Sequence, residues 1–173
     1  IGRVRNSQLL YEGIDSCIQY LYQLDCSHVI TVEGLKDEAQ IIHPVQKAMV
    51  DAAGSQCGYC TPGFVMSIAA MLETRESFTR LSVQDGLTGN LCRCTGYEQI
   101  IEAAISLKRL ITVSSGLNPP SKRFNKKVMV EDFKKHASKP LLCEYEQKWN
   151  GTTNSARIFV PCNLKEAIEF KQK

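Results

Sequence analysis

Two short stretches of this chain are the most informative: GSQCGYCTPG, residues 54–63, and GNLCRCTGY, residues 89–97. They contain four of the eight cysteines, spaced as C-x-x-C in the first stretch and as C-x-C in the second. Each pair lies in a turn rich in Gly and Thr, directly before a helical pattern. The two turns can therefore surround one metal centre with four thiolates, an arrangement that indicates a redox function.

Four thiolates can bind either a tetrahedral zinc ion or a [2Fe-2S] cluster. Both cysteine turns precede helix N-termini, where the helix dipole and the free N–H groups favour anionic sulfur and lower the pKa of a thiol. Zinc sites more often pair C-x-x-C with a second C-x-x-C, so the C-x-C half favours the cluster. The spacing alone leaves three alternatives open: a cluster, a zinc ion, and disulfides or free thiols.

The overall composition is that of a globular protein with a packed core. Of the 173 residues, 43% are hydrophobic, and 21 basic residues against 18 acidic ones give a net charge of +3. This charge is too small to indicate a nucleic-acid partner, and we find no apolar run long enough to suggest a membrane partner. We expect a cytoplasmic protein, because cysteines in a reducing compartment more often bind metals or catalyse than form disulfides.

Residues 43–113 have the apolar spacing of helices. The first predicted helix carries apolar side chains at i, i+3, i+4 and i+7, and it is expected to end at Gly54. The four predicted helices begin with Pro44 at the first position, with Thr61 and with Thr79 as N-caps, and near Tyr97. Two helix pairs, each with a cysteine turn at its junction, predict a small four-helix bundle.

Short β-rich segments flank the helices. Val4–Tyr11 has the pattern of a strand edge, and the β-branched run Val29–Val32 predicts a strand. Near the other end, Arg157–Pro161 predicts a strand that enters a turn, and Asn163–Ile168 predicts the first turns of a capped helix. The chain opens at Ile1 within a strand-like segment, so we expect an N-terminally truncated piece of a longer protein.

The amino-acid sequence of the two cysteine stretches resembles that of the helical [2Fe-2S] domain of the molybdenum hydroxylases, the xanthine dehydrogenase and aldehyde oxidase family. The segments TVEGL, residues 31–35, and HPVQ, residues 43–46, are also similar to segments of that family and occur in the same order along the chain. The resemblance covers residues 14–112 strongly and residues 157–170 weakly. The weaker part of the resemblance is to the opening of the family's FAD domain. A chain that continues from the iron–sulfur domain into an FAD domain is similar to the small, iron–sulfur and FAD subunit of bacterial xanthine dehydrogenases.

The resemblance implies a role for each residue of the two cysteine stretches that matches the family motif. Cys57, Cys60, Cys92 and Cys94 are expected to ligate the cluster nearer the molybdenum cofactor. Gln56 and Cys94 are expected to lie beside the pterin of that cofactor. For Gln56, a hydrogen-bonding role at a helix end is the alternative.

A second cluster is a further feature of the family. Its plant-type ferredoxin domain binds a [2Fe-2S] cluster through C-x4-C-x2-C and a later fourth cysteine, which Cys17 matches. The first three ligands have no counterpart in this sequence, and a single thiolate cannot hold a cluster. Three further cysteines, Cys26, Cys143 and Cys162, match no motif, and we expect them to be free thiols.

The resemblance predicts an α+β chain of four parts. Residues 1–36 are expected to be the remnant of a plant-type ferredoxin (β-grasp) domain, and residues 37–113 an all-α, four-helix [2Fe-2S]-binding bundle. Residues 114–156 are expected to be a linker, because they open with a run rich in Ser, Gly and Pro. Residues 157–173 are expected to start an FAD-binding domain.

By resemblance, the chain is the electron relay of a molybdenum-dependent xanthine dehydrogenase, and no residue of it is expected to catalyse. Hypoxanthine and xanthine would be oxidised at a molybdopterin cofactor in a large subunit, and electrons would pass through [2Fe-2S] to FAD and NAD. The expected partners are that molybdenum-binding subunit and the FAD domain. The alternatives are part of an aldehyde or N-heterocycle hydroxylase and, in a different class, a structural four-cysteine zinc module.

Overall fold

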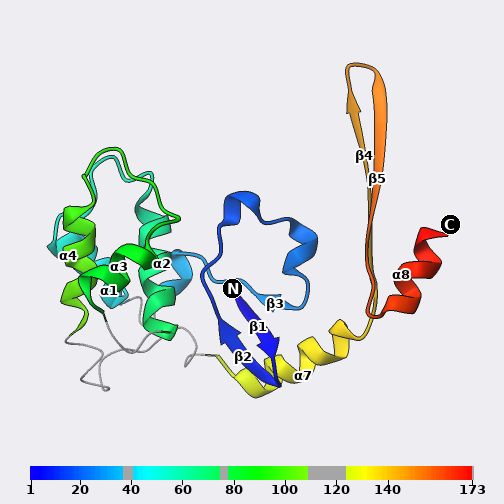
Figure 1. The fold of residues 1–173 in the computed structure, drawn as a ribbon, viewed down its shortest axis with the longest axis horizontal. Coiled ribbons are helices and arrows are strands. Elements are labelled where there is room, and N and C mark those ends of the chain that lie inside the picture. The colour runs from blue at the N-terminus through cyan, green and yellow to red at the C-terminus, as the bar shows by residue number, and fades with distance from the viewer. Residues whose placement is uncertain (37–40, 75–77, 109–123, 173) are drawn as a thin grey trace.

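The computed structural model describes residues 1–36, 41–74, 78–108 and 124–172. These residues form a small N-terminal sheet, a group of four α-helices, and a C-terminal unit of helix, hairpin and helix (Figure 1). The predicted mixture of helices and small sheets is therefore confirmed. In the part of the chain that the structure describes, no helix has both the length and the apolar character to cross a membrane.

The N-terminal sheet has three antiparallel strands in the order β2-β1-β3. The strands are β1 (Gly2–Arg5), β2 (Gln8–Tyr11) and β3 (Ser27–His28). Between β1 and β2, Asn6 and Ser7 have φ values of 50° and 62°, as in a two-residue type I′ hairpin turn. The strand pattern of Val4–Tyr11 is therefore divided between two strands of a hairpin.

The strand predicted for Val29–Val32 is wrong. β3 ends at His28, and the 3-10 helix η3 (Glu33–Leu35) follows a short irregular segment. Ile30 and Val32 pack against the buried side chains of the helices. Contact with the helical core, rather than pairing with a strand, explains the β-branched residues at these positions.

The four helices pack around one apolar core. They are α1 (Pro44–Asp51), α2 (Thr61–Thr74), α3 (Arg80–Gly86) and α4 (Glu98–Ser106). Both α1 and α3 pack against α2 and α4. The largest side chains that this core encloses are Val45, Phe64, Ile68, Phe78, Val83 and Ile100. The four helices that the apolar spacing predicts are therefore present.

The end of α1 differs from the prediction, because the helix stops before Gly54. Ala53 adopts the left-handed conformation, with a φ of 50°. The Gly54 N–H donates to the Met49 carbonyl at 2.8 Å, and the Ala53 N–H donates to the Val50 carbonyl at 3.0 Å. This is a Schellman motif in which Ala53, not Gly54, is the left-handed residue. A Cβ at Gly54 would lie 3.1 Å from the Met49 side chain, so a larger residue there would require Met49 to shift by a few tenths of an ångström.

The starts of α2 and α3 illustrate two kinds of capping. Thr61 is the first residue of α2 rather than its N-cap, because the Cys60 carbonyl already accepts the Phe64 N–H at 3.2 Å. Thr79 is the N-cap of α3, as predicted, and its side chain accepts the Ser82 N–H. The main chain of Cys60 therefore begins α2 while its side chain belongs to the cysteine turn.

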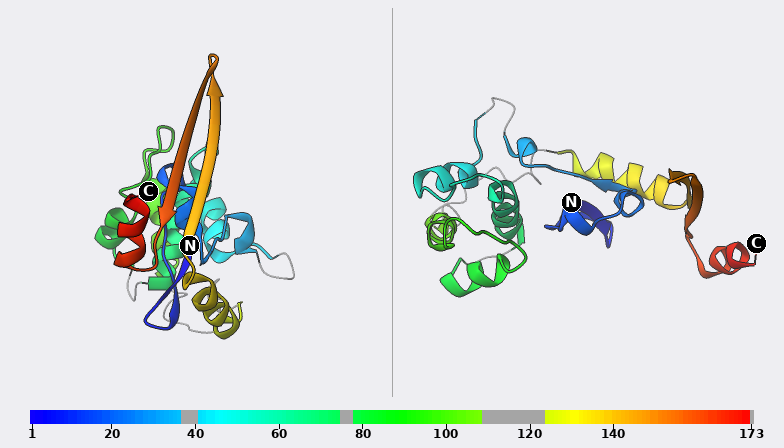
Figure 2. Two further views of the ribbon diagram at one scale, coloured as in Figure 1. Left: turned by 90° about the vertical axis from the view of Figure 1, so that its right-hand side faces the viewer. Right: turned by 90° about the horizontal axis from the view of Figure 1, so that it is seen from above.

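The C-terminal unit consists of α7 (Lys126–Ala137), the antiparallel strands β4 (Leu141–Trp149) and β5 (Thr152–Val160), and α8 (Leu164–Lys171). The β4–β5 hairpin lies on the opposite side of the N-terminal sheet from the helical group (Figure 1), and it is seen nearly end-on in the right-hand view of Figure 2. The predicted strand near Arg157 and the helix capped by Asn163 are confirmed. Much of the expected linker, residues 114–156, lies in α7 and the hairpin, whereas residues 114–123 lie outside the described residues.

Ile68→Ala is expected to lower the free energy of unfolding by about 2–5 kcal/mol, because it leaves a cavity in a close-packed core. The Ile68 side chain is 0% exposed and lies at the centre of α2. The measurement is a urea titration followed by circular dichroism, and the midpoint should fall without a change in the slope m.

The control for this experiment is Leu81→Ala on α3. Leu81 is 68% exposed, so its truncation should change the free energy of unfolding by no more than about 0.5 kcal/mol. If both variants unfold at the midpoint of the parent chain, the four helices do not share the core described above.

Candidate metal centre

The two cysteine turns lie side by side at one end of the helical group (Figure 1). The first turn leads into α2 and the second leads into α4. The thiol of Cys57 lies within hydrogen-bonding reach of Cys94, and the thiol of Cys60 lies within reach of Cys92. Each pair therefore takes one cysteine from each turn, with Cys60 and Cys92 less exposed than Cys57 and Cys94.

Two thiol pairs suit a two-iron group better than a single metal ion. A zinc site needs four sulfurs at about 2.3 Å from one point, whereas a [2Fe-2S] cluster distributes four thiolates over two irons. The donor set and its division into pairs therefore fit a [2Fe-2S] cluster.

The two thiols of the inner pair have opposite pKa shifts. Burial raises the pKa of Cys60 to about 11. Hydrogen bonding by the Thr95 side chain lowers the pKa of Cys92 to about 7. Since thiolates are the metal ligands, Cys92 is the member of this pair that ionises near neutral pH, and metal binding would release the proton of Cys60.

The outer pair shows the same division. A hydrogen bond from the Tyr59 N–H lowers the pKa of Cys57, and the neighbouring Cys57 raises the pKa of Cys94. Gly58 makes the first turn possible, because its φ of 83° lies in the region that favours glycine. Each pair therefore combines one thiol whose pKa is lowered with one whose pKa is raised.

The segment after the C-x-C motif surrounds the Cys92 sulfur with donors. The Thr95 hydroxyl oxygen lies 3.1 Å from the Cys92 Sγ, and the Thr95 N–H donates to the same sulfur at 3.4 Å. Gly96 and Tyr97 then have φ values of 67° and 71°, and this left-handed pair turns the chain into α4. The residues that follow the C-x-C motif are thus arranged around the Cys92 sulfur.

Tyr97 anchors the second turn to the helical core. Its hydroxyl accepts the Cys92 N–H at 3.0 Å, and its carbonyl accepts the Ile101 N–H at 2.9 Å in the first turn of α4. Its ring packs edge to face on Phe64 of α2, with ring centroids 6.2 Å apart. One residue therefore connects the second cysteine turn, the start of α4 and the start of α2.

Comparison with known proteins gives a consistent result. Residues 31–105 match the family described as the [2Fe-2S] binding domain. The chain is 37% identical over 162 residues to a xanthine dehydrogenase of Oryza sativa subsp. japonica, covering 89% of this chain and 11% of that enzyme. It is 36% identical over 111 residues to a probable xanthine dehydrogenase component of Bacillus subtilis, covering 63% of each.

A solved structure extends the comparison. The crystal structure of quinoline 2-oxidoreductase from Pseudomonas putida 86 aligns with a TM-score of 0.50 and 31% identity, over 56% of this chain and 62% of that one. The chain is a homologue of the xanthine dehydrogenases and aldehyde oxidases. Its homologues are oxidoreductases, and the chain contains their [2Fe-2S] binding domain.

Of the expected site residues, the structure places Cys57 beside Cys94 and Cys60 beside Cys92. Gln56 is exposed in the first turn, next to Cys57. Cys17 lies elsewhere, exposed on the 3-10 helix η1 (Ser16–Ile18), where its N–H donates to the Asp15 side chain at 3.1 Å.

Sequence reasoning missed Thr95 and Tyr97 as contributors to the site. Both lie in residues 89–97, directly after the C-x-C motif. The sequence feature that could have indicated them is a Thr and an aromatic residue that closely follow this motif. Their roles depend on two positive φ values and on contacts across the core. A sequence pattern does not specify either feature.

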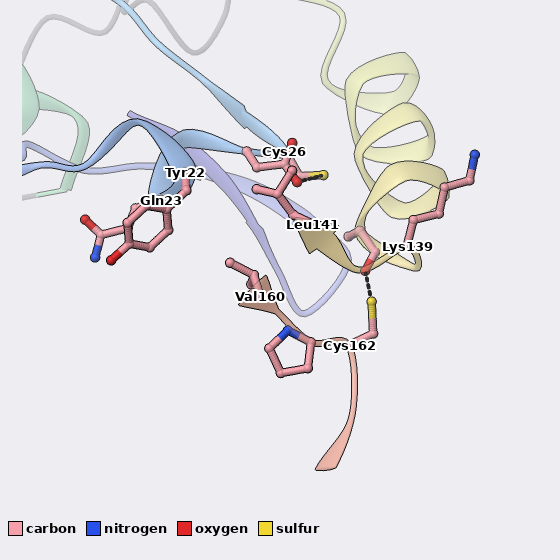
Figure 3. A pocket seen from close by; sticks show the side chains of 10 residues that line it. Tyr22, Gln23, Cys26, Lys139, Leu141, Val160 and Cys162 are labelled. Atoms are coloured by element: carbon pink, nitrogen blue, oxygen red, sulfur yellow. Dashed lines mark hydrogen bonds between the residues drawn. The ribbon is translucent and has the colours of Figure 1, made fainter. Parts of the chain in front are cut away.

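None of the eight cysteines, all of which lie among the described residues, forms a disulfide. Cys143 lies in β4, and Cys26 and Cys162 line one pocket between residues 22–26, which precede β3, and the C-terminal unit (Figure 3). Cys162 donates to the Ala137 carbonyl at 3.5 Å. Desolvation raises the pKa values of Cys26 and Cys162, so both remain protonated at neutral pH and are poor nucleophiles.

Tyr97→Phe is expected to lower the free energy of unfolding by about 1 kcal/mol. The substitution keeps the ring contact with Phe64 but removes the acceptor of the Cys92 N–H. Urea titration of the metal-free chain measures the change. The matched control is Tyr59→Phe in the first turn, since Tyr59 is 94% exposed and loss of its hydroxyl should leave the midpoint unchanged. Equal midpoints for all three proteins would rule out an anchoring role for the Tyr97 hydroxyl.

Proposed function

We propose that this chain is the electron-relaying iron–sulfur part of a molybdenum-dependent hydroxylase. Cys57, Cys60, Cys92 and Cys94 would hold one [2Fe-2S] cluster, which accepts and passes on single electrons when bound. The crosswise pairing of thiols from the two turns is the observation that supports this proposal most directly. The four thiols lie within the part of the chain that matches the [2Fe-2S] binding domain.

The residues of this chain would bind the cluster in a fixed position, with hydrogen-bond donors to two of its four cysteine sulfurs. The helices fix the two turns, and the N–H groups of Tyr59 and Thr95 donate to the sulfurs of Cys57 and Cys92. Such donors stabilise anionic sulfur and tune the reduction potential. We assign no acid–base or nucleophilic step to this chain, and its contribution to the reaction would be electron transfer.

Xanthine dehydrogenase is the specific activity that we propose for the assembled enzyme, with hypoxanthine and xanthine as substrates. The names of the rice and Bacillus relatives support this choice, whereas the quinoline 2-oxidoreductase supports an N-heterocycle hydroxylase and rabbit aldehyde oxidase 1 an aldehyde hydroxylase. A substrate screen of the assembled enzyme with purines, aldehydes and quinoline distinguishes the three. Oxidation of xanthine coupled to NAD reduction is the expected result.

The proposed partners follow from the same function. A molybdenum-binding large subunit would supply electrons through its molybdopterin, with Gln56 and Cys94 placed beside the pterin, and FAD would receive them. In this proposal residues 1–36 derive from a ferredoxin-type domain, residues 37–113 hold the cluster, residues 114–156 link, and residues 157–173 start the FAD domain. A cytoplasmic location suits thiols that must stay reduced until they bind iron.

Cys17 is proposed as the fourth ligand position of the ferredoxin-type cluster, and it cannot hold that cluster alone. The isolated chain should therefore contain about two irons and two acid-labile sulfides, the content of one [2Fe-2S] cluster. Anaerobic visible spectra before and after dithionite, combined with iron and sulfide analysis, test this. A colourless chain with one zinc would instead support a structural module, and two EPR signals would show a second cluster.

Cys92→Ser is expected to remove most of the iron and sulfide, because a serine hydroxyl is a much poorer ligand for iron than a thiolate. The control is Cys143→Ser, which removes a thiol from β4 outside the candidate centre and should keep the iron content of the parent chain. Full iron and sulfide content in Cys92→Ser would show that Cys92 is not a ligand.

A further inference from the structure

Two groups of Thr95 lie within hydrogen-bond distance of the Cys92 sulfur. The Thr95 hydroxyl lies at 3.1 Å, and the Thr95 N–H donates at 3.4 Å. The N–H is a main-chain group, which side-chain substitutions other than proline retain. The Thr95 hydroxyl is the side-chain donor, so a substitution can remove it selectively.

A second contact fixes the direction in which the Thr95 hydroxyl donates. The Tyr97 N–H donates to the Thr95 Oγ1 at 3.2 Å, and an amide N–H can only donate. The oxygen of Thr95 is therefore the acceptor toward Tyr97, and its hydrogen remains available for Cys92. A metal-bound cysteine sulfur carries no proton, so between these two side chains the hydroxyl must be the donor.

We propose that the Thr95 hydroxyl raises the reduction potential of the iron–sulfur centre by donating a hydrogen bond to the Cys92 sulfur. This inference rests on the proposed function, since it requires a cluster bound at Cys92. Tyr97 contributes indirectly, because its N–H orients the hydroxyl. Thr95 is thus a positioning residue that acts on the centre through a ligand.

The sign of the effect follows from charge. Reduction adds one electron to the iron pair, breaks no bond, and increases the negative charge on the thiolate sulfurs. A hydrogen bond to a more negative acceptor is stronger, so the Thr95 hydroxyl stabilises the reduced state more than the oxidised state. Removing the hydroxyl should therefore shift the midpoint potential to a more negative value.

A purely structural role for Thr95 predicts a different result. Valine has nearly the shape of threonine but leaves the Tyr97 N–H without its acceptor, so a loss of stability in Thr95→Val does not distinguish the two roles. Serine retains both hydrogen bonds and removes only the methyl group. A structural role would change the stability of Thr95→Val and leave its potential at the parent value.

The experiment is an anaerobic potentiometric titration of the chain, reduced stepwise with dithionite and followed by visible absorption and EPR. Iron and sulfide are measured first on the parent, Thr95→Val, Thr95→Ser and Thr88→Val. Thr88 is an exposed threonine whose hydroxyl donates to the Asp85 carbonyl at 2.9 Å, so its substitution is the matched control. We expect a more negative midpoint for Thr95→Val, and parent midpoints for Thr95→Ser and Thr88→Val.

Each outcome separates the two proposals. A parent chain without iron and sulfide would overturn the proposed function and, with it, this inference. A parent chain with a cluster and a Thr95→Val variant of equal iron content and equal midpoint would overturn the inference alone. If Thr95→Val does not retain the cluster, Thr95→Ala is titrated in its place. Should both lose the cluster while Thr95→Ser keeps it, the hydroxyl is required for assembly and the tuning role is rejected.

Discussion

Four thiols from two distant turns can share one centre only if the helices that follow the turns are fixed relative to each other. The edge-to-face contact between Phe64 and Tyr97 provides this constraint. Phe64 lies in the first turn of α2 and is 0% exposed, and Tyr97 is the N-cap of α4. Because each aromatic residue lies within a few positions of a cysteine, core packing at this point also fixes the distance between the two turns.

The crosswise pairing of thiols follows from this arrangement. Each thiol of one turn lies next to a thiol of the other turn, so each neighbouring pair of thiols requires both turns. Burial weakens ionisation of Cys60, whereas hydrogen bonds strengthen that of Cys92. The pair therefore consists of one thiol and one readily formed thiolate, so a metal must displace fewer protons from it than from two ordinary thiols.

The sequence predicts the helical part well, because its signals are local. The capping pattern at Thr79 and the apolar spacing depend on neighbours within one or two turns of helix, and the four cysteines are marked by their spacing. Residues Val29–Val32 show where such signals fail, since β-branched residues fit either a strand or a packed irregular segment. Their contacts with the helical core decide the outcome, and those contacts are distant in sequence.

The same reasoning explains what spacing could not reveal about the candidate centre. C-x-x-C and C-x-C specify which thiols are available, but not which thiol of one turn faces which thiol of the other. That choice depends on the left-handed residues Gly58, Gly96 and Tyr97, which set the direction of the main chain in the two turns. It also depends on Tyr97 accepting the Cys92 N–H, a contact between a main-chain donor and a hydroxyl five residues later.

Within the second turn, separate atoms of Cys92 serve separate purposes. Its N–H donates to the Tyr97 hydroxyl and so belongs to the packed scaffold, whereas its sulfur contacts the Thr95 hydroxyl and is a ligand in the proposed iron–sulfur centre. The two contacts involve different atoms of the same residue and have different chemical partners. A fold that holds the main chain in this way can vary the hydrogen bonding of the sulfur without loosening the turn. This separation gives a short C-x-C-T-G-Y segment both a rigid holder and an adjustable potential.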